Sequence, residues 1–224
     1  AIVDEAGVRR LVVPWQGYGN ARAAAAAALA GCDWLFFLDS DERLGEGAVE
    51  AFARWRASSP AVPHYRLVTR DWAELPGRRF LFRSEHHVRL VRKDAATWDP
   101  RMVVHEALPK RPSAVMEAVI EHRFATSVET LVSKQDRYAL LWAIKAHAEG
   151  RRPKNTLLQR PAHLLRDCVL KGGAFRGGLD ALRLGWGVSR YHARKHELLR
   201  EVAGGAHAEA VRAYAEGRFD ALFR

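Results

Sequence analysis

The sequence predicts an α/β fold that continues into a basic helical extension. Residues 34–38 form a run of five apolar residues, typical of a short strand buried on both faces, as in a parallel sheet. Acidic residues follow this run directly, which marks the end of the strand. From residue 127 onward the pattern is helical and rich in Arg and Lys. We therefore expect two regions, an α/β domain over residues 1–122 and a helical extension over residues 123–224.

Length and composition are those of a globular protein. A chain of 224 residues with 48% hydrophobic residues can bury a sizeable core. No apolar run approaches the ~18 residues of a membrane span, and residues 1–30 lack a signal-peptide pattern. Cys32 and Cys168 lie far apart and provide neither a disulfide framework nor a metal-binding spacing. We expect a reducing, cytoplasmic setting.

The first expected elements form a strand, helix, strand unit. Residues 9–13 predict a short strand. Residues 14–19, which include Pro14, Gly17 and Gly19, predict a loop. Asn20 can cap a helix over the alanine-rich residues 21–30, which Gly31 ends. The strand at 34–38 follows. This order predicts a right-handed parallel crossover.

The middle of the chain predicts further strands around a basic loop. Residues 45–57 are amphipathic and predict a helix. The strand candidates are residues 64–69, 88–92 and 102–104. The basic residues 70–87, with a turn at Pro76-Gly77, predict a loop between the first two.

The last hundred residues predict helices. The longest pattern extends over residues 127–149 and ends at Arg151-Arg152-Pro153. Shorter helical patterns follow at residues 156–170, 179–184 and 191–202.

Asp39 and Asp41 are the strongest candidates for a site. Where the chain is still extended, residues two apart point to the same side, so the two carboxylates can converge. Unpaired carboxylates are costly to hold together, and a hard divalent cation bound with phosphate oxygens resolves this cost. The alternative is a solvated turn or a helix cap after the strand.

The net charge is concentrated in the C-terminal part. Residues 1–122 contain 17 Lys or Arg and 16 Asp or Glu, whereas residues 123–224 contain 19 and 10. The partner should therefore be anionic: a membrane surface, a phosphorylated ligand or nucleic acid. Nucleic acid is the weakest of the three, because aromatic residues are not interleaved with Lys and Arg in a binding motif.

An ordered set of motifs resembles the family 2 glycosyltransferases of GT-A fold. Residues 17–22, the alanine-rich helix and residues 33–44 resemble the central part of that family. The downstream elements resemble the subgroup of bacterial lipopolysaccharide-core glucosyltransferase-like enzymes. They are residues 89–92, 104–106 and 134–138, His122 and the basic helices.

The resemblance implies a fold and a set of site residues. The fold would be a Rossmann-like mixed sheet flanked by helices, with residues 1–122 as an N-terminally incomplete catalytic domain, because the family's opening strands are not found ahead of Ala1. Asp39 and Asp41 match the D-x-D motif that holds Mg²⁺ or Mn²⁺ against the donor diphosphate. Glu106 falls at the subgroup's His-Glu motif and would be the general base of an inverting displacement. The remaining donor-binding candidates are Arg22, Gln135, Arg137 and Tyr138. The family commonly has Asn after the Arg of its helix, where this chain has Ala23.

The resemblance also implies partners and a place of action. It implies a nucleotide-sugar donor, UDP-linked, and a saccharide or glycolipid acceptor of the bacterial envelope such as the lipopolysaccharide core. The enzyme would be cytoplasmic and peripheral at the inner face of the cell membrane, since basic amphipathic helices can lie among anionic headgroups.

Non-catalytic alternatives remain open for the chain and for several of these residues. The chain could be a basic binding module without catalysis, on anionic lipid or nucleic acid, or an inactive glycosyltransferase fragment. Glu106 could be a surface acid paired with an Arg, and His122 a structural histidine. The paired carboxylates and the separate Glu106 favour the enzyme, because a binding module needs neither.

Overall fold

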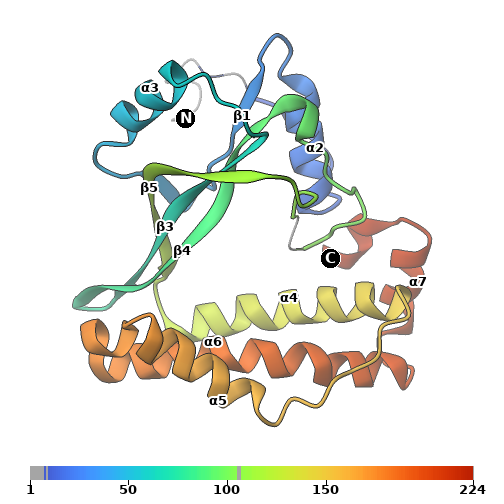
Figure 1. Cartoon of the computed structure of the whole chain (residues 1–224). Coiled ribbons are helices and arrows are strands. Elements are labelled where there is room, and N and C mark those ends of the chain that lie inside the picture. Colours follow the sequence, from blue (N-terminus) through green and yellow to red (C-terminus); the bar gives the residue numbers. More distant parts are fainter. Residues whose placement is uncertain (1–7, 9, 105–106, 224) are drawn as a thin grey trace.

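The chain forms a mixed α/β structure in which a five-stranded sheet lies over a layer of helices (Figure 1). The computed structural model describes residues 8, 10–104 and 107–223. Helices α2 and α3 lie near the upper end of the sheet in this view, and α4, α5 and α6 lie below it. This arrangement agrees with the predicted α/β class and is compatible with a Rossmann-like fold.

One mixed sheet contains all strands of the described residues, in the order β1-β4-β3-β5-β2. Only β3 and β5 run parallel, and the other three pairs are antiparallel. The strands are β1 (Trp34–Phe36), β2 (Glu42–Leu44), β3 (His64–Leu75), β4 (Arg78–Arg92) and β5 (Ser113–Ala125).

The helices fall into two groups. Those before or beside the first strands are α2 (Tyr18–Ala28), α3 (Ala48–Ala57) and the single turn η1 (Lys93–Ala95). Those that follow the sheet are α4 (Val128–Ala148), α5 (Gln159–Leu164), η2 (Leu165–Leu170), α6 (Gly173–Ala203), α7 (Ala208–Ala215) and η3 (Phe219–Phe223). Among the described residues, no helix combines the length and the apolar character that crossing a membrane requires.

The predicted parallel crossover is wrong. Residues 10–13 form no strand, and Arg9 lies outside the described residues. Strand β1 is only three residues long and pairs antiparallel with β4 at the edge of the sheet. Its apolar run has another cause: Trp34 packs edge-on against Trp55 and Phe36 against Phe52, both on α3. The aromatic side chains therefore attach a helix to an edge strand.

The predicted basic loop at residues 70–87 is wrong except for its turn. Strands β3 and β4 run through it as a long hairpin, with only Pro76 and Gly77 in the turn. Charged residues alternate with buried ones, as Phe80 and Phe82 are 4% and 0% exposed. The charges pair across the hairpin, for example Arg83 Nε with Asp71 Oδ2 at 2.7 Å.

Strand β5 is absent from the sequence-based expectation, although it lies between β3 and β2. Its buried residues Met116, Ala118 and Ile120 alternate with polar or partly exposed ones. The strand expected at residues 102–104 is instead irregular, and Val103 and Val104 are buried in the core of the helical layer.

The helical predictions are largely confirmed. The structure has α2, α3 and α4 within a few residues of the expected positions. Ser127 caps α4, since its side chain accepts a hydrogen bond of 3.0 Å from the Thr130 amide. The two helices expected at 179–184 and 191–202 are one helix, α6, with a break in helical geometry at Gly178 (φ 58°, ψ −136°).

Candidate active site

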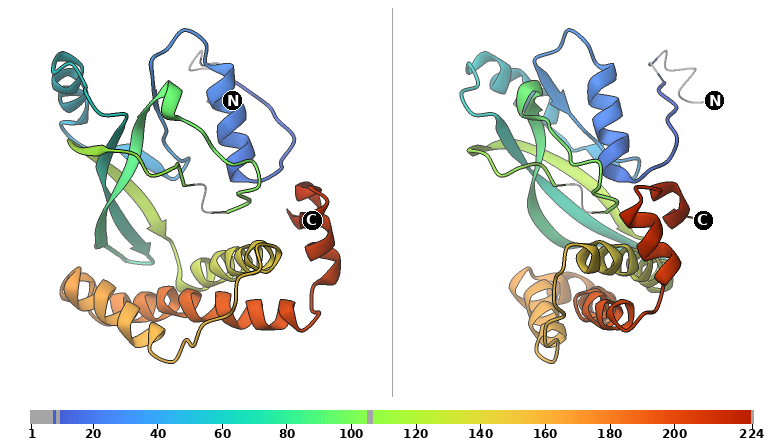
Figure 2. Two further views of the ribbon diagram at one scale, coloured as in Figure 1. Left: turned by 45° about the vertical axis from the view of Figure 1, so that its right-hand side comes forward. Right: turned by 90° about the vertical axis from the view of Figure 1, so that its right-hand side faces the viewer.

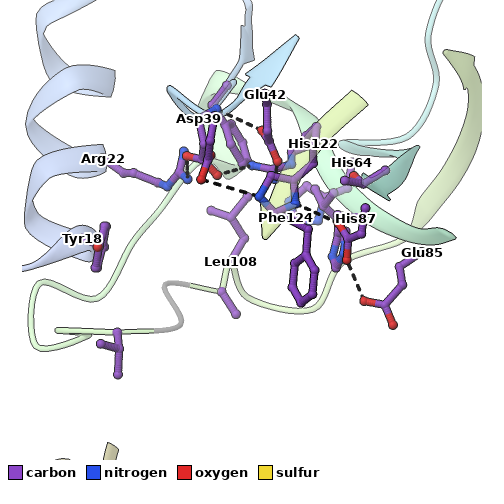
Figure 3. Close-up of a pocket in the computed structure, with 18 of the residues that line it drawn as sticks. Tyr18, Arg22, Asp39, Glu42, His64, Glu85, His87, Leu108, His122 and Phe124 are labelled. Atoms are coloured by element: carbon purple, nitrogen blue, oxygen red, sulfur yellow. Dashed lines mark hydrogen bonds and ion pairs between the residues drawn. The ribbon is translucent and has the colours of Figure 1, made fainter. Parts of the chain in front are cut away.

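A cavity of about 930 Å³ is lined by residues of the sheet and of the helices α2 and α4. Figure 3 shows side chains that line it from the sheet and from α2. The segment that follows β1 forms one side of it, with Asp39, Ser40 and Asp41 among the lining residues. Strands β3, β4 and β5, the segment 107–111 and α4 supply the rest. Side chains from distant parts of the sequence therefore meet at the acidic end of β1.

Two arginines hold Asp39. The Arg22 Nη2 group on α2 donates to Asp39 Oδ1 at 2.7 Å, and Arg89 Nη1 on β4 donates to Asp39 Oδ2 at 3.1 Å. Arg89 also pairs with Glu42, whose second oxygen accepts from the Asp39 backbone amide at 2.9 Å. Figure 3 shows Arg22 reaching from its helix toward Asp39. Charge-assisted bonds to both oxygens fix the orientation of this carboxylate.

Asp41 has looser partners, and both approach the same oxygen. His122 Nε2 on β5 lies 3.6 Å from Asp41 Oδ2, and Lys134 Nζ on α4 lies 3.8 Å from it. The His122 imidazolium, assisted by Lys134, lowers the pKa of Asp41 to about 2. Asp41 is therefore ionised at neutral pH.

His122 lies between two carboxylates. Its Nδ1 donates to Asp71 Oδ1 at 2.7 Å, and its Nε2 faces Asp41. Burial alone would lower its pKa, but the two carboxylates outweigh this effect and raise the pKa of His122 to about 9. The imidazole is accordingly a fixed cation at neutral pH and lacks the free nitrogen that a general base needs.

A chain of buried charges connects the cavity to the helical layer. Asp71 Oδ2 accepts from Arg83 Nε at 2.7 Å, and Arg83 Nη1 contacts Asp167 Oδ2 at 3.5 Å. Asp167 is 1% exposed, and Arg166 binds it at 2.8 Å. Burial alone would raise the pKa of Asp167, but Arg166 and Arg83 hold it below its usual value. Each buried acid has more than one cationic partner, since Asp71 also pairs with His122 and Asp167 with Lys171.

Some polar groups of the cavity have no protein partner among the described residues. Lys110 and Arg111 line the cavity, are exposed and form no ion pair in the part of the chain that the structure describes. The buried atoms Thr69 Oγ1 and His64 Nε2 also lack a hydrogen-bond partner within those residues. A polar anionic ligand could pair with Lys110 and Arg111, which are exposed in the cavity.

The carboxylates of the cavity suit a metal ion that is shared with a ligand. Within the described residues, no three His, Cys, Asp or Glu side chains gather into a metal-binding group. Mg²⁺ is usually held by one or two carboxylates plus phosphate oxygens and water, so it does not require a third protein ligand. The Asp39 side chain is the more exposed of the two, at 42% against 31% for Asp41, but guanidinium groups engage both of its oxygens. Asp41 is therefore the carboxylate with the looser protein partners.

The chain is similar to one curated protein, the lipopolysaccharide core biosynthesis glycosyltransferase LpsC of Rhizobium meliloti (strain 1021). The two are 25% identical over 182 residues, which cover 77% of this chain and 65% of that protein. The chain thus spans slightly less than two thirds of its relative's length. No family model matches the chain, and no solved structure does either. The similarity supports a relationship to glycosyltransferases.

Four of the residues predicted for the site line this cavity: Arg22, Asp39, Asp41 and Tyr138. The hydroxyl groups of Tyr138 and Tyr18 are hydrogen-bonded at 2.6 Å. Gln135 and Arg137 are not among the lining residues, and Arg137 Nη2 donates to the Phe223 carbonyl at 3.1 Å.

The predicted general base, Glu106, lies outside the described residues. The described neighbours on either side, Val104 and Ala107, line the cavity.

Sequence reasoning missed the ion pairs that join His122 to Asp71 and Asp71 to Arg83. It placed Asp71 and Arg83 in a basic loop, and it favoured a structural role for His122. An alternating pattern was the available signal, because Asp71, Arg83 and Arg89 all occupy long strands whose register brings them to the cavity. Lys110 and Arg111 carried no recognisable signal.

Proposed function

We propose that this chain is a glycosyltransferase that moves a hexose from a UDP-linked donor to a saccharide of the bacterial envelope. The observation that carries the proposal is the cavity itself. Asp39 and Asp41 open into it, and two cations without carboxylate partners among the described residues, Lys110 and Arg111, line it as well. The similarity to a lipopolysaccharide core glycosyltransferase agrees with this chemistry.

The cavity contains cations that can bind the diphosphate of the donor. Lys110 and Arg111 can donate to phosphate oxygens without first breaking an ion pair within the described residues. Lys134 lies near Asp41 and is 52% exposed, so its ammonium can turn toward an anion in the cavity. These cations would bind the negative charge that grows on the leaving diphosphate and so stabilise the transition state.

Mg²⁺ or Mn²⁺ would be held by Asp41 together with the diphosphate oxygens, and Asp39 stands beside it. Such an ion supplies a Lewis acid for the departing diphosphate and a template for its orientation. Arg22 and Arg89 then serve to keep Asp39 and its segment in place, since they bind both of its oxygens.

The proposed chemistry is a single displacement with inversion. Glu106 would accept the proton of the acceptor hydroxyl while that oxygen attacks the anomeric carbon opposite the diphosphate. Base catalysis of this kind contributes about 10²- to 10⁴-fold. His122 cannot take this role at neutral pH, because its carboxylate neighbours keep it protonated.

The family, the acceptor and the location are the finer parts of the proposal. We infer a family 2 glycosyltransferase of GT-A fold whose acceptor is a lipopolysaccharide core saccharide. The basic residues 123–224 would keep the enzyme at the anionic, cytoplasmic face of the inner membrane.

Calorimetric titration of UDP and UDP-glucose, with and without Mn²⁺, tests the donor site. Tighter binding with Mn²⁺ is expected, and Asp41→Asn should weaken the metal-dependent binding by about ten-fold or more. Glu117→Gln is the matched control, because Glu117 is an exposed carboxylate (89%) that does not line the cavity. If a folded sample binds no nucleotide, or if Asp41→Asn leaves the Mn²⁺ effect unchanged, the proposal is wrong.

A further inference from the structure

Helix α6 carries apolar side chains on two opposite faces. Leu184 and Val188 are buried in the core that the helix shares with β4. Leu179, Leu182 and Trp186 are exposed by 71%, 40% and 53%. At about 100° per residue, these three lie on the side of the helix opposite Leu184 and Val188. One apolar face is thus covered by the protein and the other is not.

The elements packed beside α6 also expose large apolar side chains. Helix α5 and the π-helix η2 pack on α6 (Figure 2), and Arg160 of α5 lies over the Trp186 ring at 4.1 Å from its centroid. Among the described residues, nine of the eighteen large hydrophobic side chains that are exposed fall within residues 157–186. Their exposure ranges from 40% to 82%. We call this set the apolar surface: Leu157, Leu158, Leu165, Val169, Leu170, Phe175, Leu179, Leu182 and Trp186.

The segment that carries the apolar surface has a cationic excess, although Lys171 pairs with Glu85 and Arg190 with Asp136. Residues 151–190 contain nine Lys or Arg and only two Asp or Glu. One of the two acids, Asp167, is 1% exposed, and the other, Asp180, pairs with Arg78 and Arg183. Arg152 and Lys154 are exposed beside Leu157. An occupant of this surface must therefore be both apolar and anionic.

We propose that the apolar surface docks on an anionic lipid bilayer, with its large side chains inserted at the boundary between headgroups and acyl chains. A bilayer offers both required properties at once, apolar chains beneath a layer of phosphate. A second copy of the chain fits less well, because two surfaces with such a cationic excess repel each other. The inference rests on the proposed function only in that a membrane-borne acceptor gives the docking a purpose.

Co-sedimentation with vesicles tests this surface. The wild-type chain should bind vesicles of phosphatidylcholine and phosphatidylglycerol and not vesicles of phosphatidylcholine alone. The double variant Phe175→Ser/Leu179→Ser should bind these vesicles more weakly by about ten-fold or more, since two large apolar contacts are lost. The variant Arg152→Glu/Arg183→Glu should bind these vesicles more weakly, with an affinity loss of about five-fold or more for each arginine replaced. The loss should be larger at low salt. The control Val12→Ser/Val49→Ser changes side chains exposed by 78% and 70% outside the surface and should bind normally.

Each other result overturns the inference. Equal binding to neutral vesicles would remove the role of charge, and unchanged binding by Phe175→Ser/Leu179→Ser would remove the role of the apolar surface. A wild-type dimer that this variant converts to a monomer, without vesicle binding, would identify a second copy as the occupant. Circular dichroism should show all variants folded, because the changed side chains are exposed. UDP binding of Phe175→Ser/Leu179→Ser should be unchanged, so the donor site and the docking surface can fail independently.

Discussion

Replacing His122 by Gln should change how stability depends on pH. Asp41 and Asp71 raise the pKa of His122 from 6.5 to about 9, and its side chain is 21% exposed. A raised pKa means that protonation stabilises the folded state. The stabilisation is complete below pH 6.5, declines as pH rises and is lost above about 9. This difference in pKa corresponds to about 3 kcal/mol.

Urea denaturation followed by circular dichroism, from about pH 6 to about pH 10, measures the effect. The free energy of unfolding of the wild type should exceed that of His122→Gln by about 3 kcal/mol more at the acid end than at the alkaline end. Titration of other groups largely cancels in this difference. His86→Gln is the control, since it changes an exposed histidine of β4 that does not line the cavity. A constant difference for His122→Gln, or an NMR titration of His122 centred near 6.5, would refute the reasoning.

Two further substitutions test the packing of α6 and the cations of the cavity. Gly185→Ala should lower the free energy of unfolding by about 1–3 kcal/mol, because a Cβ there would lie 2.3 Å from the sulfur of buried Cys168. Gly204→Ala, whose nearest atoms are at 3.4 Å, should be nearly neutral in the same urea titration. Lys110→Ala/Arg111→Ala should weaken UDP binding by about ten-fold or more, since a hydrogen bond to a charged group contributes about 1.5–3 kcal/mol. Arg56→Ala, at an exposed position on α3, should leave the calorimetric affinity unchanged, and equal losses in both would contradict a phosphate-binding role.

The helices were more predictable from the sequence than the sheet. Helix signals are local: the alanine-rich segment and the Ser127 cap each determine their helix within a few residues. Strand partners depend on contacts between distant residues, so the apolar run at β1 could not reveal that its neighbour is β4 and antiparallel. The many charged residues of β3 and β4 favoured the prediction of a loop. In the structure Arg83 and Asp71 pair across the hairpin, a contact that the local sequence does not reveal.

The candidate site likewise has a part that local sequence predicts and a part that depends on contacts between distant residues. The aspartates were predictable because both lie in one short segment at the end of an apolar run. Arg22, Arg89, His122 and Lys134 belong to the motifs of the resemblance, but how they pair with the aspartates was not predictable, since they come from four different elements that only the fold brings together. Gln135 follows Lys134 on α4, yet it does not line the cavity, because neighbouring residues on a helix point in directions about 100° apart.

The protein binds the two aspartates of the cavity with different tightness, and this difference bears on which of them a ligand can use. Asp39 is bound on both oxygens, at 2.7 Å and 3.1 Å, so a cation that approached it would be repelled by two guanidinium groups. Among the described residues, the cations that approach Asp41 both face one of its oxygens, at 3.6 Å and 3.8 Å, and the coulombic attraction of such looser contacts is weaker. Its nearer partner, His122, is itself held by Asp71 at 2.7 Å and need not move. The first aspartate therefore anchors the segment, whereas the second remains the group that can exchange a protein partner for a bound one.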